Sequence, residues 1–381
     1  MSSREEKRAL RQQRKAEKAR LKEERYYLAS QWTLMARKLS KHRLAKVSLV
    51  ILGIFYIVAL FGDFFAPYSL TAYDSSYKDT APSSIHFYYE GEWIGPYVFK
   101  LTSQRDPVTY KKVFTEDTSQ PCRIVFFTQG ESYKLFGLIP CSTHLFGAEN
   151  GAKVMLFGSD SMGRDMLSRI ILGSQISLTI PFAGTFISFI LGLLIGSASG
   201  YFGGKLDAVI QRVIEVLNSL PSIPLWMALS AAIPPEVSMT QKYLLITVIL
   251  SLIGWTGLAR VVRGKFMSLK NEDYVMAARL AGVSDFKIIT KHLIPGFMSY
   301  LIVSLTLGIP GMIIGETSMS FLGLGIQSPA TSWGVLLKDA QDISNIANYP
   351  WRLIPLFFVV VAVLAFNFLG DGIRDAADPY K

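Results

Sequence analysis

Six long uncharged stretches, each dominated by apolar residues, are spread along the chain. They cover residues 47–62, 170–204, 216–235, 243–259, 292–315 and 353–370. The hydrocarbon core of a bilayer is about 30 Å thick, and a helix needs roughly 20 apolar residues to cross it. The pattern therefore predicts an all-α polytopic membrane protein with six transmembrane helices, the first of them over 47–66.

Charge is unevenly distributed, and this predicts how the spans are oriented. Residues 1–46 hold 15 Lys and Arg against 5 Asp and Glu, an excess equal to the net charge of +10 of the whole 381-residue chain. Because Lys and Arg resist translocation, we expect this basic segment in the cytoplasm, and six spans would return the carboxyl terminus there. Nucleic-acid binding is not expected, since the segment offers neither an aromatic platform nor a groove-reading motif.

Residues 67–155, between the first two spans, do not have the composition of a linker. Aromatic and β-branched runs punctuated by glycine are typical of strands and hairpins, and they occur over 84–93, 95–101, 123–127 and 133–138. We expect a small β-rich extracytoplasmic insert, with its second hairpin turning at Gln129 and Gly130. Long loops cross the membrane largely regardless of their charge, so this placement agrees with the rule for basic loops.

The two cysteines of the chain, Cys122 and Cys141, flank this second hairpin. A turn midway between them would bring them across from each other, near disulfide distance, on the oxidising side of the membrane. We predict a disulfide, with two free buried thiols as the alternative. A metal site is not expected, because two cysteines without a well-spaced histidine supply too few ligands for zinc.

Small residues recur at every fourth position of the second uncharged stretch and form one stripe on a helix. In lipid, such stripes let helix backbones approach closely, so we expect tight packing, with a lining for a pathway as the alternative. Gly311 and Gly315 repeat the spacing in the fifth span. Pro221, Pro224 and Pro310 should bend the third and fifth spans, since proline removes an intrahelical hydrogen bond. The stripe consists of Gly184, Ser188, Gly192, Gly196 and Gly200.

Sequence motifs for enzyme chemistry are absent, so no catalytic residues are assigned. Gly203-Gly204-Lys205 is followed by Leu206, which does not fit a nucleotide-binding loop, and neither HExxH nor GxSxG occurs. Glu215 and Glu316 are the acids nearest lipid. A carboxylate inside a span is a functional candidate, so Glu316 is a possible pathway residue, although we expect both acids near helix ends where solvation is easy.

The cytoplasmic loop between the fourth and fifth spans, 266–295, has the most informative pattern. Glu272 and Asp273 suit the start of a helix, Gly282 suits its end, and a second helix should begin near Ser284. Small residues where the helices meet would fit a groove on another protein, with an ordinary connecting loop as the alternative. The residues expected at such a contact are Asp273, Tyr274, Met276, Ala277, Ala278, Arg279 and Gly282.

This loop resembles the EAA motif of bacterial ATP-binding-cassette (ABC) importer permeases. Ala277, Ala278, Gly282 and Pro295 fall in register with the motif, whereas Met276 stands in place of its glutamate. Further stretches resemble signatures of the dipeptide and oligopeptide permeases, namely residues 39–68, 157–178, 200–207, 315–325 and 370–379. The long insert is similar, more loosely, to that of the Yej-type peptide permeases.

The resemblance implies that residues 156–381 form the transport core of a multi-pass permease in a bacterial cytoplasmic (inner) membrane. Its implied partners are a second homologous permease, two ATPase subunits and an extracytoplasmic substrate-binding protein. ATP and Mg²⁺ would be bound by the ATPase subunits, and this chain would hold no cofactor. Peptides are the implied cargo, with oligosaccharides or a nickel complex as alternatives. An ion-coupled secondary carrier is the alternative of another class, and it would normally show deeper ionisable residues.

Overall fold

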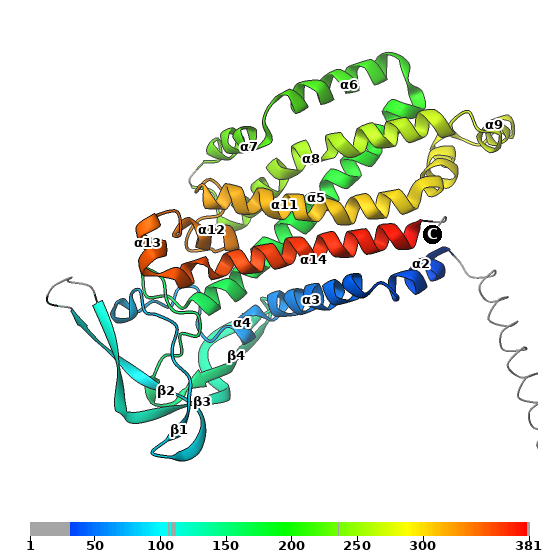
Figure 1. The fold of residues 1–381 in the computed structure, drawn as a ribbon. Helices are drawn as coiled ribbons and strands as arrows, with labels where there is room; N and C mark the ends of the chain where they lie inside the picture. Colours follow the sequence, from blue (N-terminus) through cyan, green and yellow to red (C-terminus); the bar gives the residue numbers. More distant parts are fainter. Residues whose placement is uncertain (1–30, 106, 108–111, 235, 379–381) are drawn as a thin grey trace, which may run out of the picture.

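The computed structural model describes residues 31–105, 107, 112–234 and 236–378. Most of the predicted basic amino-terminal segment, residues 1–30, lies outside this range. Among the described residues, five helices are long and apolar enough to cross a membrane, and the mean hydropathy of their most apolar stretches lies between 1.9 and 2.5. They lie side by side in one bundle (Figure 1). The spans are built on α3 (Arg43–Leu60), α5 (Met166–Phe202), α8 (Met239–Leu269), α11 (Met298–Phe321) and α14 (Ile354–Ala377).

The third predicted span is not a straight helix. Residues 216–235 take in the last turn of α6 (Gly204–Ser219) and all of α7 (Ser222–Ala231), whose axes are bent by 89°, so a sixth span is present only if this bent pair counts as one. The break falls at Pro221, which pushes the preceding Leu220 into extended backbone with φ −91° and ψ 133°. The predicted bend at this proline is therefore confirmed, whereas Pro224 lies in the first turn of α7, where proline is tolerated.

Short helices close the two ends of the bundle. At the end marked by the carboxyl terminus in Figure 1 lie α2 and α9, and at the opposite end lie α4, α12, α13 and the sheet. The short α-helices are α2 (Gln31–Leu39), α4 (Gly62–Phe65), α9 (Asp273–Leu280), α10 (Asp285–Lys287), α12 (Trp333–Lys338) and α13 (Ile343–Asn348). The single turns are η1 (Ser75–Tyr77), η2 (Glu149–Gly151), η3 (Ile288–Leu293), η4 (Ile294–Phe297) and η5 (Pro350–Leu353).

The stripe of small residues on α5 packs against α8, as predicted. A Cβ added at Gly196 would lie 2.6 Å from the carbonyl oxygen of Ala259, so the two backbones are in direct contact there. Two serines also form hydrogen bonds between α5 and α8. Ser188 Oγ donates to the Ser251 carbonyl at 3.0 Å, and Ser251 Oγ donates to the Gly184 carbonyl at 3.1 Å. The stripe therefore provides both the close approach and hydrogen bonds between the helices.

On α11 the two glycines of the repeated spacing behave differently. A Cβ at Gly315 would meet the Trp226 ring at 3.1 Å, so this glycine serves packing. No atom lies within 4 Å of a Cβ built at Gly311, which means that the extension of the packing prediction to this position is wrong.

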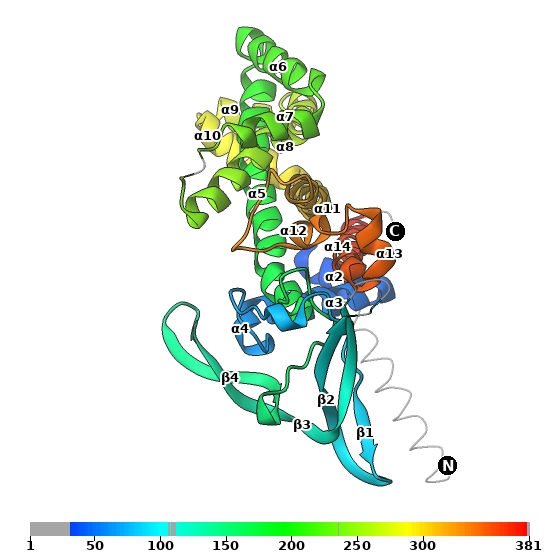
Figure 2. The same ribbon diagram turned by 90° about the vertical axis from the view of Figure 1, so that its left-hand side faces the viewer.

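The predicted β-rich insert is confirmed as a four-stranded antiparallel meander in the order β1-β2-β3-β4. The strands are β1 (His86–Tyr89), β2 (Glu92–Arg105), β3 (Lys112–Leu135) and β4 (Ile139–Ala148). Strand β3 pairs with β2 through its first part and with β4 through its second part. Because β3 is shared in this way, the β3–β4 hairpin diverges from β1 and β2 (Figure 2).

The predicted disulfide is wrong, because the second hairpin turns later than expected. The turn lies at residues 136–138, not at Gln129 and Gly130, which are inside β3. Cys141 is consequently opposite Tyr133, while Cys122 is opposite Val98 on the other neighbouring strand. Both thiols are free, with Cys122 buried in the insert.

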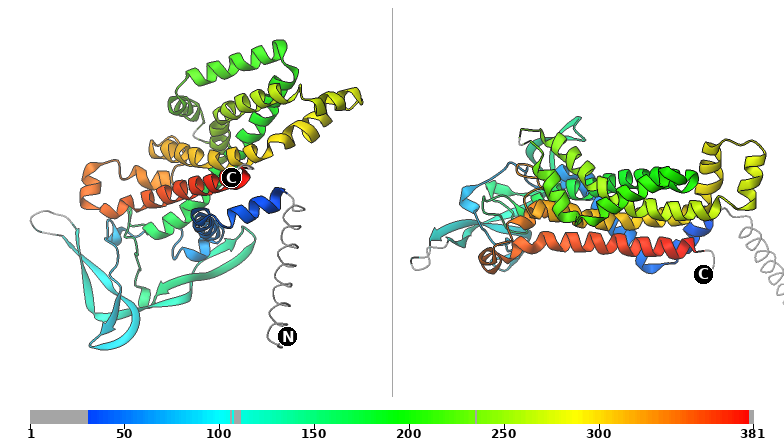
Figure 3. Two further views of the ribbon diagram at one scale, coloured as in Figure 1. Left: turned by 45° about the vertical axis from the view of Figure 1, so that its right-hand side comes forward. Right: turned by 90° about the horizontal axis from the view of Figure 1, so that it is seen from above.

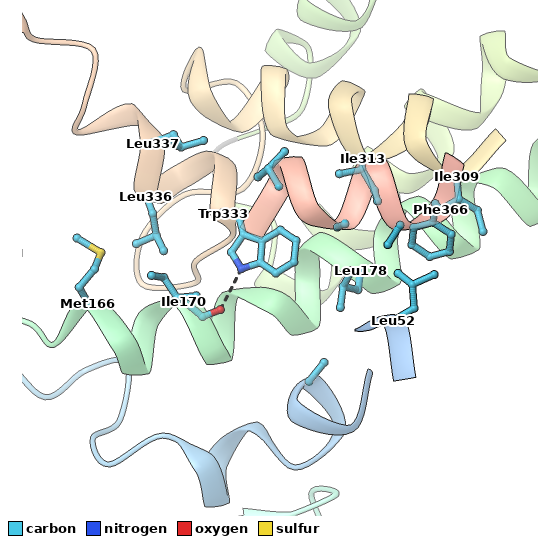
Figure 4. Packing of buried hydrophobic residues seen from close by; sticks show 14 residues of the cluster. Leu52, Met166, Ile170, Leu178, Ile309, Ile313, Trp333, Leu336, Leu337 and Phe366 are labelled. Atoms are coloured by element: carbon cyan, nitrogen blue, oxygen red, sulfur yellow. Dashed lines mark hydrogen bonds between the residues drawn. The ribbon is translucent and has the colours of Figure 1, made fainter. Parts of the chain in front are cut away.

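A cluster of buried side chains joins four of the spans at the sheet-proximal end (Figure 4). Its centre is Trp333 of α12, whose indole N–H donates to the carbonyl of Ile170 at 3.0 Å. The indole ring also packs against the rings of Phe55 and Phe358, with centroids 5.9 and 6.1 Å away. Helix α12 is thereby held between α3, α5 and α14.

The loop before α5 is organised by the buried carboxylate of Asp160. It accepts two backbone N–H bonds, from Met162 and Arg164, and ion pairs from the side chains of Arg164 at 2.7 Å and Arg169 at 2.5 Å. Burial by itself would raise the pKa of Asp160, but the positive charge of Arg169 and the other donors outweigh it and lower this pKa. Asp160 is therefore a fixed anion at the end of the bundle nearer the sheet.

The same loop joins the insert to the spans. The Ser159 N–H donates to the Thr80 carbonyl at 2.9 Å, and the Trp351 indole N–H donates to the Ser159 carbonyl at 3.0 Å. Gly163 is required here, because a Cβ would lie 1.9 Å from the Asp74 carbonyl oxygen and its φ is +79°. Residues distant in sequence thus meet at one loop.

We expect Gly196→Ala to destabilise the protein by about 1–3 kcal/mol, because the new methyl group forces α5 away from Ala259. The matched control is Gly264→Ala on α8, where no atom lies within 4 Å of the added carbon. The control should be neutral or slightly stabilising, because alanine favours helix more than glycine does. Thermal unfolding in detergent measures both, and equal stability of the two variants would contradict the packing argument.

We also expect Asp165→Asn to change how stability depends on pH. Burial raises the pKa of Asp165, the N-cap of α5, from 3.8 to about 6. The stability contributed by the bound proton is present below the unfolded pKa and is lost as the pH rises through the folded pKa. Between about pH 4 and pH 7 the free energy of unfolding of the wild type therefore falls by roughly 3 kcal/mol.

The asparagine variant retains an oxygen for capping but does not titrate. Its melting temperature, relative to that of the wild type, should therefore increase across this pH range. Parallel curves for the two proteins would contradict the raised pKa.

Candidate functional site

The helical loop between α8 and α11 forms the candidate site. Helix α9 begins after Glu272 in extended backbone, and it ends before Gly282, which has φ +75°. Hydrogen bonds from the N–H groups of Gly282 and Val283 to Arg279 and Ala278 carbonyls close its last turn. A second helical segment follows from Asp285 through α10, η3 and η4 into α11. The prediction of two helices meeting at a glycine is confirmed.

The inner face of α9 is anchored in a core of its own. Val275 and Ala278 are buried and pack in a cluster with Phe266 of α8 and Ile288 and Leu293 of η3. Ala278 therefore faces the bundle, and the expectation that both alanines present themselves at the tip is wrong for this one. Helical spacing places Ala277 on the exposed side instead.

The outer face of α9 and α10 is apolar and unusually exposed. Leu280 is 88% exposed and Phe286 75% exposed, although each would be buried in an ordinary domain. Tyr274 and Met276 are each 45% exposed on the same loop. The loop projects beyond the spans at the end opposite the sheet, as the yellow segment in Figure 3 (right) shows. Large apolar side chains exposed together on one short loop are typical of a protein contact.

Two polar contacts fasten this loop to the end of α5. The Tyr201 hydroxyl donates to Asp285 Oδ1 at 2.5 Å, and the Arg279 guanidinium lies 5.2 Å from the centre of the Tyr201 ring. Sequence reasoning did not single out Tyr201 or Asp285. The sequence did indicate that residues 200–207 resemble a signature of the dipeptide and oligopeptide permeases. A resemblance of this kind does not say which residue Tyr201 contacts.

A second clamp joins the start of α6 to α8 close by. Arg263 donates two bonds to Asp207, with Nε–Oδ1 and Nη2–Oδ2 distances of 2.5 and 2.6 Å. Ser199 Oγ donates to Asp207 as well, at 2.5 Å. Such a bidentate pair fixes direction as well as distance, so α5, α6 and α8 are held in one arrangement at the α9 end of the bundle.

Glu316 is fully buried, contrary to the expectation of easy solvation near a helix end. Its carboxylate accepts hydrogen bonds from Ser320 Oγ at 2.7 Å and Ser177 Oγ at 3.4 Å. Ser177 Oγ in turn accepts the backbone N–H of Trp333 at 2.9 Å. This carboxylate therefore joins α11, α5 and the segment leading into α12, a position that favours a structural role over the predicted pathway role.

Two adjoining clefts open beside α8 and α11, the smaller bordered also by α5 and the larger by α14. The smaller, of about 300 Å³, is floored by Gly254, Gly308 and Gly311, and the larger, of about 770 Å³, reaches Arg374 of α14. Their shared lining is Leu258, Ser304 and Gly308. Small side chains on one face of α11 thus leave open volume inside the bundle. Within the described part of the chain, no three His, Cys, Asp or Glu side chains converge as a metal site would require.

Comparison with known proteins identifies related chains. Residues 189–380 match the family described as binding-protein-dependent transport system inner membrane component, and residues 30–82 match the N-terminal TM domain of oligopeptide transport permease C. The sheet lies between the two matched regions and outside both.

Individual relatives agree with these matches. The oligopeptide transport system permease protein OppC of Haemophilus influenzae is 43% identical over 58% of this chain and 70% of its own. The dipeptide transport system permease protein DppC of Bacillus subtilis is 41% identical over 58% of this chain and 68% of its own. Among solved structures, an inward-facing MetNI methionine ABC transporter chain is similar, with a TM-score of 0.46 and 18% identity, over 57% of this chain and 100% of that chain.

We expect Tyr201→Phe to loosen the loop, because it removes a hydrogen bond to a charged carboxylate at a side chain only 6% exposed. A bond of this kind is worth about 1.5–3 kcal/mol. Hydrogen–deuterium exchange over residues 273–287 should become faster in the variant. Tyr300→Phe, which removes the hydroxyl of a tyrosine 39% exposed on α11, is the matched control. Unchanged exchange in Tyr201→Phe would show that the bond does not hold the loop.

Proposed function

Because this chain belongs to the family of binding-protein-dependent transport system inner membrane components, we propose that it is a membrane-spanning permease subunit of an ABC importer for peptides. The exposed apolar face of α9 and α10 at one end of a multi-span bundle carries this proposal. Such a face needs a partner, and in an importer that partner is the ATPase. ATP and Mg²⁺ are bound by two ATPase subunits, and a second homologous permease completes the pathway.

The cargo is inferred from the relatives, whose names specify oligopeptide and dipeptide transport. An extracytoplasmic substrate-binding protein delivers the peptide to the outer side of the permease pair. Oligosaccharides and nickel complexes are the alternative cargoes within the same class. The clefts beside α11 support a passage, because glycines and serines interrupt a mostly apolar lining and leave open volume there.

We place the α9 end of the bundle in the cytoplasm and the sheet outside. In support, α2, α9 and the end of α14 lie at one end, whereas the sheet lies at the other (Figure 1). Arg37, Lys38 and Lys41 precede α3 at the α9 end, and the loop around α9 carries further Lys and Arg. This distribution agrees with the rule that basic segments stay inside.

The structure suggests how nucleotide binding would reach the pathway. A force on Leu280 or Phe286 is transmitted through the core around Val275 to α8, and through α10, η3 and η4 to α11. The Tyr201–Asp285 bond carries it to α5 as well. These three spans line the smaller cleft, so a shift of α9 changes that cleft between an inward-open and an outward-open state. Closure of the ATPase dimer favours one state through its different contacts with α9.

Met276 replaces the glutamate of the related motif, and its side chain is 45% exposed on the patch. A methionine cannot form the ion pair available to glutamate, but it adapts its shape to an apolar groove. We therefore propose that this subunit is bound by its ATPase mainly through apolar contacts, in the helix-in-groove manner.

Gly282→Trp should abolish transport and uncouple ATP hydrolysis from substrate, while leaving membrane insertion intact. Within this chain no atom lies within 4 Å of a Cβ at position 282, so the indole ring would collide with the partner protein. Tryptophan would also strain the backbone there, because φ is +75°. Gly282→Asn is the control, because asparagine tolerates this backbone region, and it should retain most uptake. Normal peptide uptake by Gly282→Trp would remove the coupling role.

The function itself is tested by reconstitution of the complete complex in proteoliposomes. Uptake of a labelled oligopeptide should require ATP, the ATPase subunits and the binding protein together. Uptake driven by an ion gradient without nucleotide would identify a secondary carrier instead. ATP-dependent uptake of an oligosaccharide or of nickel, with no peptide uptake, would retain the importer and overturn the cargo.

A further inference from the structure

The β3–β4 hairpin exposes a set of large apolar side chains that its own sheet does not cover. At its turn, Leu138 is 82% exposed, Ile139 57% and Phe136 52%. Farther along β3, Phe126 and Phe127 are 59% and 69% exposed. No charged residue occurs from residue 135 to residue 144, around the turn. Solvent-facing hairpin turns are ordinarily polar, so this composition requires an apolar environment.

The turn lies against the first span, not in open solvent. The ring of Phe136 is 5.5 Å from that of Phe61, and the ring of Phe127 is 6.2 Å from that of Phe64, both centroid to centroid. In Figure 1 the β3–β4 end of the sheet lies next to α4. The hairpin is therefore held at the outer end of α3.

The depth of the turn can be estimated from its neighbours. Phe136 and Gly137 share a cavity of about 380 Å³ with Tyr56, Ala59 and Leu60 of α3. The other residues that line it are polar, namely Asp63, Lys134, Gln175 and Thr179, as expected at the boundary between the headgroups and the acyl chains. Tyr56 precedes the end of the helix at Leu60 by four residues, which is about 6 Å at the rise of an α-helix. The turn consequently reaches below the outer end of a membrane span.

The surface of α3 beside the turn is itself apolar and uncovered by this chain. Ile57 is 54% exposed and Leu60 57% exposed on a helix of mean hydropathy 2.0. In a membrane span such a face is in contact with lipid. The exposed side chains of the turn continue this face outward, so the same lipid surface extends to them.

We propose that the turn of the β3–β4 hairpin, residues 136–140, is embedded in the outer leaflet of the bilayer and anchors the insert to the membrane. The apolar side chains lie at the headgroup–acyl boundary, a depth typical of interfacial segments. Lys134 lines the same cavity and is exposed, and its side chain is long enough to keep the ammonium group at the level of the phosphates. The sheet is then fixed at two points, the loop around Ser159 and the membrane.

A nitroxide scan of the reconstituted complex tests this proposal. In a Cys122→Ala, Cys141→Ser background, single cysteines are introduced by Leu138→Cys and Ile139→Cys and spin-labelled. Ile57→Cys on α3 provides the lipid reference, and Ser103→Cys, at an exposed position on β2, provides the aqueous reference. Collision rates with dissolved oxygen and with water-soluble chromium oxalate are measured in each variant.

At positions 138 and 139 the ratio of oxygen to chromium oxalate collisions should be close to that at position 57 and several-fold above that at position 103. A ratio equal to that at position 103 would mean that the turn is in water, and would overturn the proposal. Low collision rates with both reagents would mean that a protein, such as the second permease, covers the turn, and would overturn it equally. Both labelled side chains are exposed, so the substitutions leave the fold intact.

Discussion

The backbone contact between α5 and α8 is the constraint on which the rest of the bundle depends. It exists because Gly192, Gly196 and Gly200 have no side chain to separate the helices. Once α5 and α8 are in contact, their ends are adjacent, so that Asp207 can reach Arg263 and Tyr201 can reach Asp285. The position of the loop around α9 is thus a consequence of packing inside the bundle. A lipid-embedded pair gains little from the hydrophobic effect, which is why close packing and hydrogen bonds carry it.

The opposite end of the bundle is organised by electrostatics. Asp160 is buried with two arginines and accepts backbone N–H groups, an arrangement that keeps a charge stable away from water. Around it the start of the insert, α5 and η5 meet. The sheet is thereby attached to the rigid part of the molecule, whereas the β3–β4 hairpin turns back toward α3. The two ends therefore present different surfaces, an exposed apolar loop at one and a sheet at the other.

Much of this arrangement was predictable from the sequence, and the failures have two physical causes. The spans, the break at Pro221, the helix 273–280 and the packing stripe follow from local patterns of apolar residues, proline and glycine. The disulfide prediction failed because strand register depends on the turn, and Phe136 and Gly137 form that turn with positive φ angles. Glu316 and Ala278 were misjudged because burial depends on neighbours that are remote in sequence, such as Ser177 and Phe266.

The sequence by itself determined the membrane class, the number of apolar segments and the family, because each depends on residue type and spacing along one stretch of chain. Only the tertiary structure decided which residues meet. Tyr201 and Asp285 are 84 positions apart, and Trp351 and Ser159 are 192 positions apart. Contacts of this kind arise when several helices pack at once, and no single segment carries the information that specifies them.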